Sequence, residues 1–421
     1  MIKLASRCAA IVVTGSALAL AGGLVPAQAA TTGWRTNATV TVRGSETLFT
    51  GVAATSPGDA WAAGISDTNK GNASPQAVIR HWTGKTWRTV ALPGKVAREW
   101  ARATAIGSPV AVASARSVWV FGSFTGSYLR LSGSRWSIGR LPGAGSASSG
   151  TLTVIDAVKV FSSTNVWAFG VRELESGSAE PYAAQYNGHK WSTVTVPGSG
   201  AITAVAAVSA KDIWAVESAA SSGVLVSAAT RSALAASPAA RSAVARLHAA
   251  TSAATSPVVL QWTSKTKSWQ YAAPLPKSAA SDQFVSAVEE PGGHIWFGGS
   301  ASNSAKGTSP VTAELNGTGW SVKDLPGKAS SADWEVVSMA PDGTGGIWAL
   351  AGNTANGAER IWHLNGTRWA QARPAFGKHA WILEALAVVP GTHSAWAVGA
   401  VQGRSKSSSN GLIAVDGALP R

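Results

Sequence analysis

The chain has 421 residues, of which only 13% are charged, and it contains 45 Gly, 20 Trp and a single Cys. So many large aromatic side chains exclude a disordered chain, and so few charges exclude a coiled coil or another long-helix protein. The formal net charge of +14 is compatible with polyanionic partners, such as cell-wall polymers, anionic polysaccharides and nucleic acid, and it also reads as a cation excess that merely keeps the protein soluble.

Residues 1–29 have the pattern of a secretory signal peptide. Lys3 and Arg7 form a basic head, Ala9 to Val25 is an apolar run, and a small-x-small cleavage site follows at Ala27 to Ala29. Gly and Ser residues within the run make it too weakly apolar for a membrane span, and no later stretch qualifies. We therefore expect a secreted, extracellular protein without a membrane span.

The remaining residues, 30–421, form one predicted domain because a single pattern recurs through them. Each copy has a small turn, an aliphatic or small residue, a Trp, and a short apolar run that usually ends in Gly. The seven copies contain Trp61, Trp119, Trp167, Trp214, Trp296, Trp348 and Trp396. Their spacing of roughly 50 residues is typical of propeller blades or solenoid repeats.

A second Trp recurs in each unit, just after a tight-turn sequence such as Asn187-Gly188 or Asn365-Gly366. Asn-Gly pairs favour two-residue hairpins because both residues accept a positive φ. Each unit therefore reads as four short antiparallel strands, with the second Trp at the start of the fourth. One such sheet cannot bury both of its faces, so the units must stack. The sequence predicts an all-β protein, a seven-bladed β-propeller.

The two ends of the repeat region predict how the ring closes. The seventh unit lacks its fourth strand, because Pro420 stands where the second Trp is expected. The segment from Gly33 to Val40, with Trp34, reads as a fourth strand that has no other strands before it. We expect this N-terminal strand to complete the last blade, which hides the strand edges that an open array would expose.

The order of apolar strand ending in Gly, loop, apolar strand, turn, Trp and Leu-Pro resembles the kelch and galactose-oxidase type of seven-bladed propeller. The diglycine of kelch repeats is present only at Gly298-Gly299. The turn with its Trp is also similar to the Asp-box of sialidase-type propellers, but without the Asp. The resemblance implies the architecture and not the chemistry. Galactose oxidase uses a copper ion and a Tyr linked to Cys, and Cys8 is expected to leave with the signal peptide.

Candidate ligand-binding residues come from the Trp residues outside the two repeating positions. Trp100, Trp334 and Trp381 fall near the connections between one unit and the next, beside Arg98, Arg102 and His379. Aromatic faces and cations together suit sugar rings with acidic groups. We predict a site for carbohydrate or another cell-envelope polymer on one face of the ring. The alternative is that these three Trp residues are bulky plugs over the inner strands.

No catalytic residue, metal site or cofactor is predicted. The chain has no G-x-S-x-G elbow, H-E-x-x-H helix or Walker loop, and its seven His residues show no metal-ligand spacing. Asp59 and Asp212 precede a strand and read as turn residues. A binding or scaffolding role is thus favoured over catalysis. A glycan-active hydrolase or lyase with an axial site, and a platform for a protein partner, stay open as alternatives, whereas nucleic acid is disfavoured as a partner.

The fourth unit contains an insertion at about residues 218–256. It is rich in Ala and Ser, has no carboxylate, and contains Arg231, Arg241 and Arg246. It reads either as a basic tether to a cell-wall polyanion or as a low-complexity insertion without a role.

Overall fold

The computed structural model describes most of the repeat region. The described residues are 33–42, 45–67, 76–102, 110–122, 125–145, 152–174, 178–218, 256–279, 282–290, 292–303, 307–317, 319–326, 334–353, 357–403 and 408–419. The predicted signal peptide, and residues 219–255 of the predicted insertion, lie outside them. No helix in these ranges is long and apolar enough to cross a membrane.

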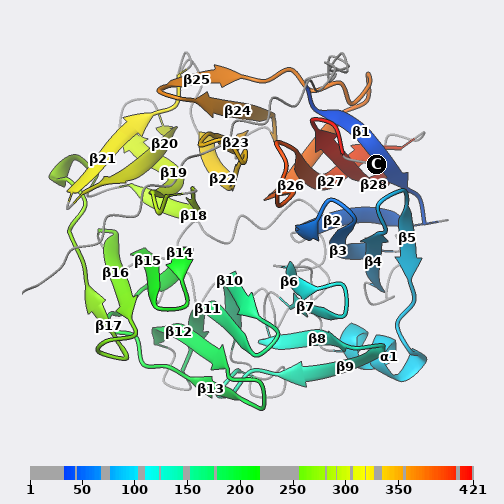
Figure 1. Ribbon diagram of the computed structural model, residues 1–421, viewed down its shortest axis with the longest axis horizontal. Coiled ribbons are helices and arrows are strands. Elements are labelled where there is room, and N and C mark those ends of the chain that lie inside the picture. Colours follow the sequence, from blue (N-terminus) through cyan, green and yellow to red (C-terminus); the bar gives the residue numbers. More distant parts are fainter. Residues whose placement is uncertain are drawn as a thin grey trace, which may run out of the picture.

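Seven four-stranded antiparallel sheets are arranged as a ring, and six of them are continuous in sequence (Figure 1). Blade 1 contains β2 (Glu46–Ser56), β3 (Asp59–Asp67), β4 (Gln76–Trp82) and β5 (Trp87–Val90); blade 2 contains β6 (Val110–Ser114), β7 (Ser117–Phe121), β8 (Ser127–Ser132) and β9 (Arg135–Arg140); blade 3 contains β10 (Thr153–Ser162), β11 (Asn165–Glu173), β12 (Ala179–Tyr186) and β13 (Trp191–Thr193). Blade 4 contains β14 (Ala201–Ser209), β15 (Asp212–Ser218), β16 (Val258–Thr263) and β17 (Ser268–Tyr271); blade 5 contains β18 (Gln283–Glu289), β19 (Ile295–Asn303), β20 (Gly307–Asn316) and β21 (Gly319–Asp324); blade 6 contains β22 (Trp334–Pro341), β23 (Ile347–Asn353), β24 (Glu359–Asn365) and β25 (Arg368–Gln371).

Blade 7 joins the two ends of the chain and confirms the predicted closure. It consists of β26 (Trp381–Val388), β27 (Ala395–Gln402), β28 (Ser409–Asp416) and the N-terminal β1 (Arg35–Val40), which lies outermost. β1 pairs antiparallel with β28, for example Thr39 with Leu412. Each of the seven inner strands, β2, β6, β10, β14, β18, β22 and β26, contacts the next one, and β26 contacts β2. The ring is therefore closed.

The antiparallel order gives the ring two chemically distinct ends. We call "turn end" the end where short turns join the first strand to the second in every blade and the third strand to the fourth in blades 1 to 6. We call "loop end" the other end, with the second-to-third connections and the connections between blades. Glycines at the turn end adopt the positive φ that the Asn-Gly pattern predicts, with 94° at Gly188 and 59° at Gly366.

The Trp residues of the two repeating positions meet between neighbouring blades. In six of the seven interfaces, the fourth-strand Trp of one blade lies edge-to-face against the second-strand Trp of the preceding blade, with ring centroids 5.0 to 6.5 Å apart. The pairs are Trp136 with Trp61, Trp191 with Trp119, Trp269 with Trp167, Trp320 with Trp214, Trp34 with Trp348, and Trp87 with Trp396. In the seventh interface, Trp369 packs on the cluster that contains Trp296. Each buried ring removes about 150 to 250 Å² from water, so these pairs carry much of the stability of the ring.

The Gly that ends the apolar run of most units has a specific steric role. Six of the seven inner strands contain one extra residue relative to the second strand, a β-bulge, midway along the blade. In four of them a Gly stands opposite the bulge, and a Cβ there would lie 2.0 Å or less from a carbonyl oxygen of the inner strand. These glycines are Gly64, Gly170, Gly299 and Gly399.

Two short helices lie in the connections between blades. The predicted strand pattern did not include α1 (Gly94–Arg102) or the 3₁₀ helix Lys277–Ala279. Val96 and Trp100 lie four residues apart in α1, so they share one side of the helix, and both pack against a cluster of blades 1 and 2. The helix contacts β4, the third strand of blade 1, and β9, the fourth strand of blade 2.

Replacing Trp34 by Ala should lower the free energy of unfolding by about 3 to 5 kcal/mol, because Trp34 is 1% exposed and its indole packs on Trp348. Urea unfolding measures this change. Tyr271→Ala is the matched control, since that aromatic side chain is 62% exposed. Equal, small effects of both substitutions would contradict the role of β1 in closing the ring.

Replacing Gly170 by Ala should cost about 3 kcal/mol, because the new methyl group would lie 1.9 Å from the carbonyl oxygen of Val154. Gly352→Ala is the control, since its Cβ would meet only a methyl group of Val337 at 3.8 Å. Thermal unfolding midpoints of the two variants distinguish them. A stable Gly170→Ala protein would mean that the bulge does not require glycine.

Candidate functional site

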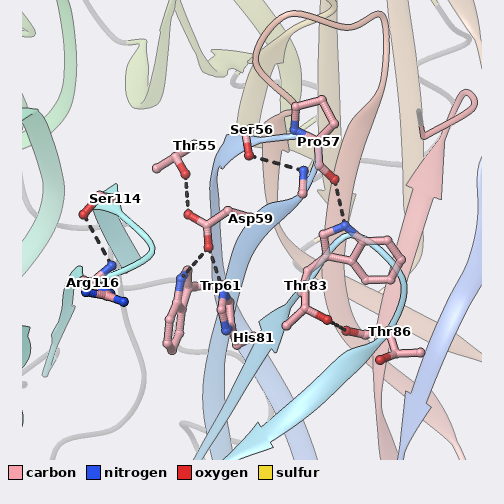
Figure 2. A network of polar contacts seen from close by, with 12 residues as sticks. Thr55, Ser56, Pro57, Asp59, Trp61, His81, Thr83, Thr86, Ser114 and Arg116 are labelled. Atoms are coloured by element: carbon pink, nitrogen blue, oxygen red, sulfur yellow. Dashed lines mark hydrogen bonds and ion pairs between the residues drawn. The ribbon is translucent and has the colours of Figure 1, made fainter. Parts of the chain in front are cut away.

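Polar side chains at the turn end of blade 1 form a closed internal network (Figure 2). Asp59 accepts hydrogen bonds from Trp61 Nε1 at 3.1 Å and from Thr55 Oγ1, and its Oδ1 lies 2.7 Å from His81 Nε2. The His81 ring also stacks on Trp61, with centroids 4.1 Å apart. The Asp59 carboxylate and the His81 imidazole thus hold the turn against Trp61, the second-strand Trp of this blade.

Other blades repeat this arrangement with different polar groups. In blade 6, Asp342 Oδ2 lies 2.8 Å from His363 Nε2, and His363 stacks on Trp348. Burial alone would raise the pKa of Asp342, but hydrogen bonds from Thr344, His363 and Gly346 outweigh it and lower this pKa below its usual range. Two of the seven His residues are therefore structural.

Amides take the same positions in blades 3 and 4. Asn165 Oδ1 accepts hydrogen bonds from Trp167 Nε1 and from Gln185 Nε2, each at 3.1 Å. Gln261 Nε2 donates to Asp212 Oδ1 at 2.8 Å. Asp59 and Asp212 thus lie at turns and bond to their own blades, as the sequence predicts.

The turn end is rich in exposed cations. Exposed Lys and Arg side chains lie in or directly beside its turns, and they are Lys85, Arg116, Arg135, Lys190, Lys211, Lys265, Lys267 and Arg368. His189, His294 and His393 are also exposed there. No described carboxylate of these turns is exposed, because each acid is buried or partly buried against its blade. The charged side chains that this end exposes fully to solvent are therefore all positive.

The three candidate Trp residues belong to three different packing clusters. Trp100 is 3% exposed and lies between blades 1 and 2. Trp334 is 9% exposed in a cluster of blades 5 and 6, and the Arg360 guanidinium lies 4.3 Å from the centroid of its ring. Trp381 is half-buried, edge-to-face with Phe376 at 5.1 Å. The structure does not bring their faces together on one surface.

The charged residues predicted beside these Trp residues lie at the loop end. Arg98 and His379 are exposed, on α1 and in the connection before β26. Arg102 is the last residue of α1, and its side chain lies outside the described part of the chain. Ligand binding by this set of residues stays a prediction.

Several carboxyl groups of the inner half of the ring are held in their neutral form. Glu335, the second residue of β22, is 2% exposed, its Oε1 has no hydrogen bond, and burial raises its pKa to about 8. Burial also raises the pKa of Glu359, whose Oε2 accepts a hydrogen bond from the backbone N–H of Leu383 in the next blade. Neutral acids here reduce the negative charge of the loop end.

Two of the bulged inner-strand residues are acids. Asp156 of blade 3 and Glu384 of blade 7 occupy equivalent bulge positions. Both are partly exposed yet surrounded by the ring of inner strands, and this desolvation raises the pKa of each carboxyl. Blades 3 and 7 are not neighbours, so the two acids do not make a catalytic pair within one wedge. Among the described residues no group of three or more His, Cys, Asp and Glu side chains could hold a metal ion.

Sequence reasoning missed the exposed cations of the turn end as a group. Their signal is visible, because Lys85, Lys190 and Arg368 stand within or beside the turn sequences that identify the repeat. What the sequence does not display is that these turns, which lie far apart along the chain, meet at one end while the acids between them are buried.

Comparisons with known proteins establish the fold. No protein-family model matches the chain, and no curated protein matches its sequence. Among solved structures, a virginiamycin B lyase from Staphylococcus aureus has a TM-score of 0.53 and 10% identity over 89% of this chain and 98% of its own. YCF48 bound to D1 peptide has a TM-score of 0.52 and 11% identity, covering 91% and 95%. An extracellular domain from B. thetaiotaomicron, described as part of a hybrid two component system, has a TM-score of 0.51 and 11% identity, covering 90% and 39%.

At these identities the likeness supports a shared β-propeller architecture and nothing about activity. The kelch and galactose-oxidase type stays a resemblance, since no family model supports it.

Replacing Glu335 by Gln should stabilise the protein at pH 8 and not at pH 4. The pKa of this carboxyl is about 8 in the folded chain, and an unfolded Glu titrates near about 4.3. The neutral carboxyl contributes its full share of folding stability at pH values below the pKa of the unfolded state. This contribution is lost as the pH rises through the pKa of the folded state. The gain at pH 8 should be on the order of 2 kcal/mol.

Thermal unfolding across this pH range measures the gain. Glu99→Gln is the control, because its side chain is 38% exposed. A Glu335→Gln effect that is the same at pH 4 and pH 8 would contradict the neutral state.

Proposed function

We propose that this protein is an extracellular binding protein that attaches to an anionic polymer of the cell envelope, and that the turn end of the propeller is its binding face. Export is expected from the signal-peptide pattern of residues 1–29. The observation that carries the proposal is the uniform sign of the turn end, where Lys and Arg are exposed and every described turn carboxylate is buried or partly buried.

Electrostatics favours a polymer over a small anion at such a face. An isolated surface charge is screened within about 8 Å at physiological salt, so a single Lys contributes little. Many charges of one sign act together on a polyanion, because each contact releases a counterion and the gains add along the chain. Binding of this kind is strong at low salt and weak at high salt.

The comparisons are compatible with a binding role without specifying it. These neighbours are a lyase, a protein with a bound peptide and an extracellular domain, so this architecture serves several functions. The catalytic alternative has less support in this chain. The His and Asp side chains of blades 1 and 6 are bonded to each other, and each His ring stacks on the second-strand Trp of its blade, so these groups hold the blade together.

The loop end provides a matched control for the turn end. It also carries exposed cations, namely Lys95, Arg98, Lys277, Arg373 and Lys378. They share that end with acids, as in the pair Lys95 with Glu99 at 3.9 Å. Removing the same number of charges from each end therefore separates a binding face from a general effect of net charge.

Binding to polygalacturonate immobilised on beads tests the proposal, with neutral amylose beads as the blank. Changing Lys85, Lys190, Lys211, Lys265 and Lys267 to Gln should weaken binding at low salt by about tenfold or more, because counterion release depends on the number of neutralised anions. The corresponding five-fold Gln variant of the loop end should change binding by less than about twofold. Equal losses in both variants, or binding that ignores salt between 50 mM and 300 mM, would overturn the proposal.

A further inference from the structure

The cations of the turn end are distributed unevenly around the ring. Blades 1 to 4 carry nearly all of them: Lys85 in blade 1, Arg116 and Arg135 in blade 2, Lys190 in blade 3, and Lys211, Lys265 and Lys267 in blade 4. Among the described turns of blades 5 to 7, the only exposed Lys or Arg is Arg368. Figure 1 shows that blades 1 to 4 follow one another from β2 to β17 around one side of the ring.

Carboxylates at this end are distributed the opposite way. Blades 5 to 7 carry Glu289, Glu290, Glu314, Asp342 and Asp416 in or near their turns. Blades 1 to 4 carry Asp59 and Asp212, and both are hydrogen-bonded within their own blades. The positive potential of the turn end is therefore concentrated on one side.

The cationic groups of blades 1 to 4 are free to bind a ligand. None of the seven side chains makes a hydrogen bond or ion pair with another residue in the described ranges. They stand one or two to a turn, so they do not converge on one point as the ligands of a single phosphate or carboxylate do. Such spacing suits repeated anionic groups along an extended chain.

We propose that a linear polyanion lies along the turns of blades 1 to 4, following the curve of the ring. We call the seven side chains of these turns the basic arc. The inference rests on the proposed function, and it adds the shape of the ligand and its place on the face. Because affinity comes from many weak contacts, a single anionic sugar does not bind and a chain long enough to pass several blades does.

Three matched variants test the arc. The arc variant changes Arg116, Lys190 and Lys211 to Gln. The opposite variant changes Arg368 to Gln and both Asn316 and Asn365 to Asp, so each variant lowers the net charge by three. The charge-conserving variant changes Arg116 to Lys and both Lys190 and Lys211 to Arg. All six positions are exposed, and equal unfolding midpoints confirm that each variant folds.

Affinities are measured by isothermal titration for galacturonic acid, a short oligogalacturonate and long polygalacturonate at low salt. We expect wild type to bind the long polymer, about tenfold weaker binding and a shallower salt dependence in the arc variant, and near wild-type binding in the other two. The monomer should not bind detectably.

Two results would overturn the inference and differ in meaning. In the first, the wild-type protein binds polygalacturonate, but the arc and opposite variants lose affinity equally or the monomer binds as well as the polymer. The inference about the basic arc is then wrong, and the proposed binding face is still supported. If wild type does not bind the polymer at low salt, the proposed function fails and the arc fails with it.

Discussion

The edge-to-face contact between the Trp residues of adjacent blades is the interaction on which the rest of this structure depends. A four-stranded sheet of this size cannot bury both faces, and the Trp pair fills the wedge on each side of it. Trp34 is decisive because it comes from the N-terminal strand and packs on Trp348 of blade 6 as the other fourth-strand Trp residues do. Without β1, the outer edge of β28 would be left unpaired.

The same packing explains why few polar side chains of the described residues are available to bind a ligand or to take part in catalysis. In blades 1 and 3, polar turn residues fix the indole of the second-strand Trp, as Asp59 does for Trp61 and Asn165 does for Trp167. Where the acids are not bonded in this way, as at Glu335, burial keeps them neutral. What stays available to a partner is the exposed set of cations on the turns, and antiparallel pairing within each blade brings these turns to one end of the ring.

The sequence predicts the architecture well because its signals are local and repeated. A Trp at a fixed place in each unit identifies blades, and the lone strand around Trp34 identifies the closure. The candidate site is harder to predict from such local signals. Trp100 is predicted in a connection between units beside Arg98 and Arg102, but nothing in the repeat pattern shows that this connection forms α1, which packs Val96 and Trp100 between blades 1 and 2. Exposure of a Lys at one turn, and burial of an Asp at the next, depend on cross-strand neighbours that spacing along the chain does not reveal.

Hydrogen exchange of the backbone amides of β1 tests the closed ring most directly. The basic arc depends on this closure, because it needs the turns of several blades at one end of the ring. In the full chain, the β1 amides that donate to β28 should exchange as slowly as the β28 amides that donate to β27, because closure makes β1 part of the same cooperative sheet. Exchange of the β1 amides at the rate of an unstructured peptide, while β28 stays protected, would contradict the account.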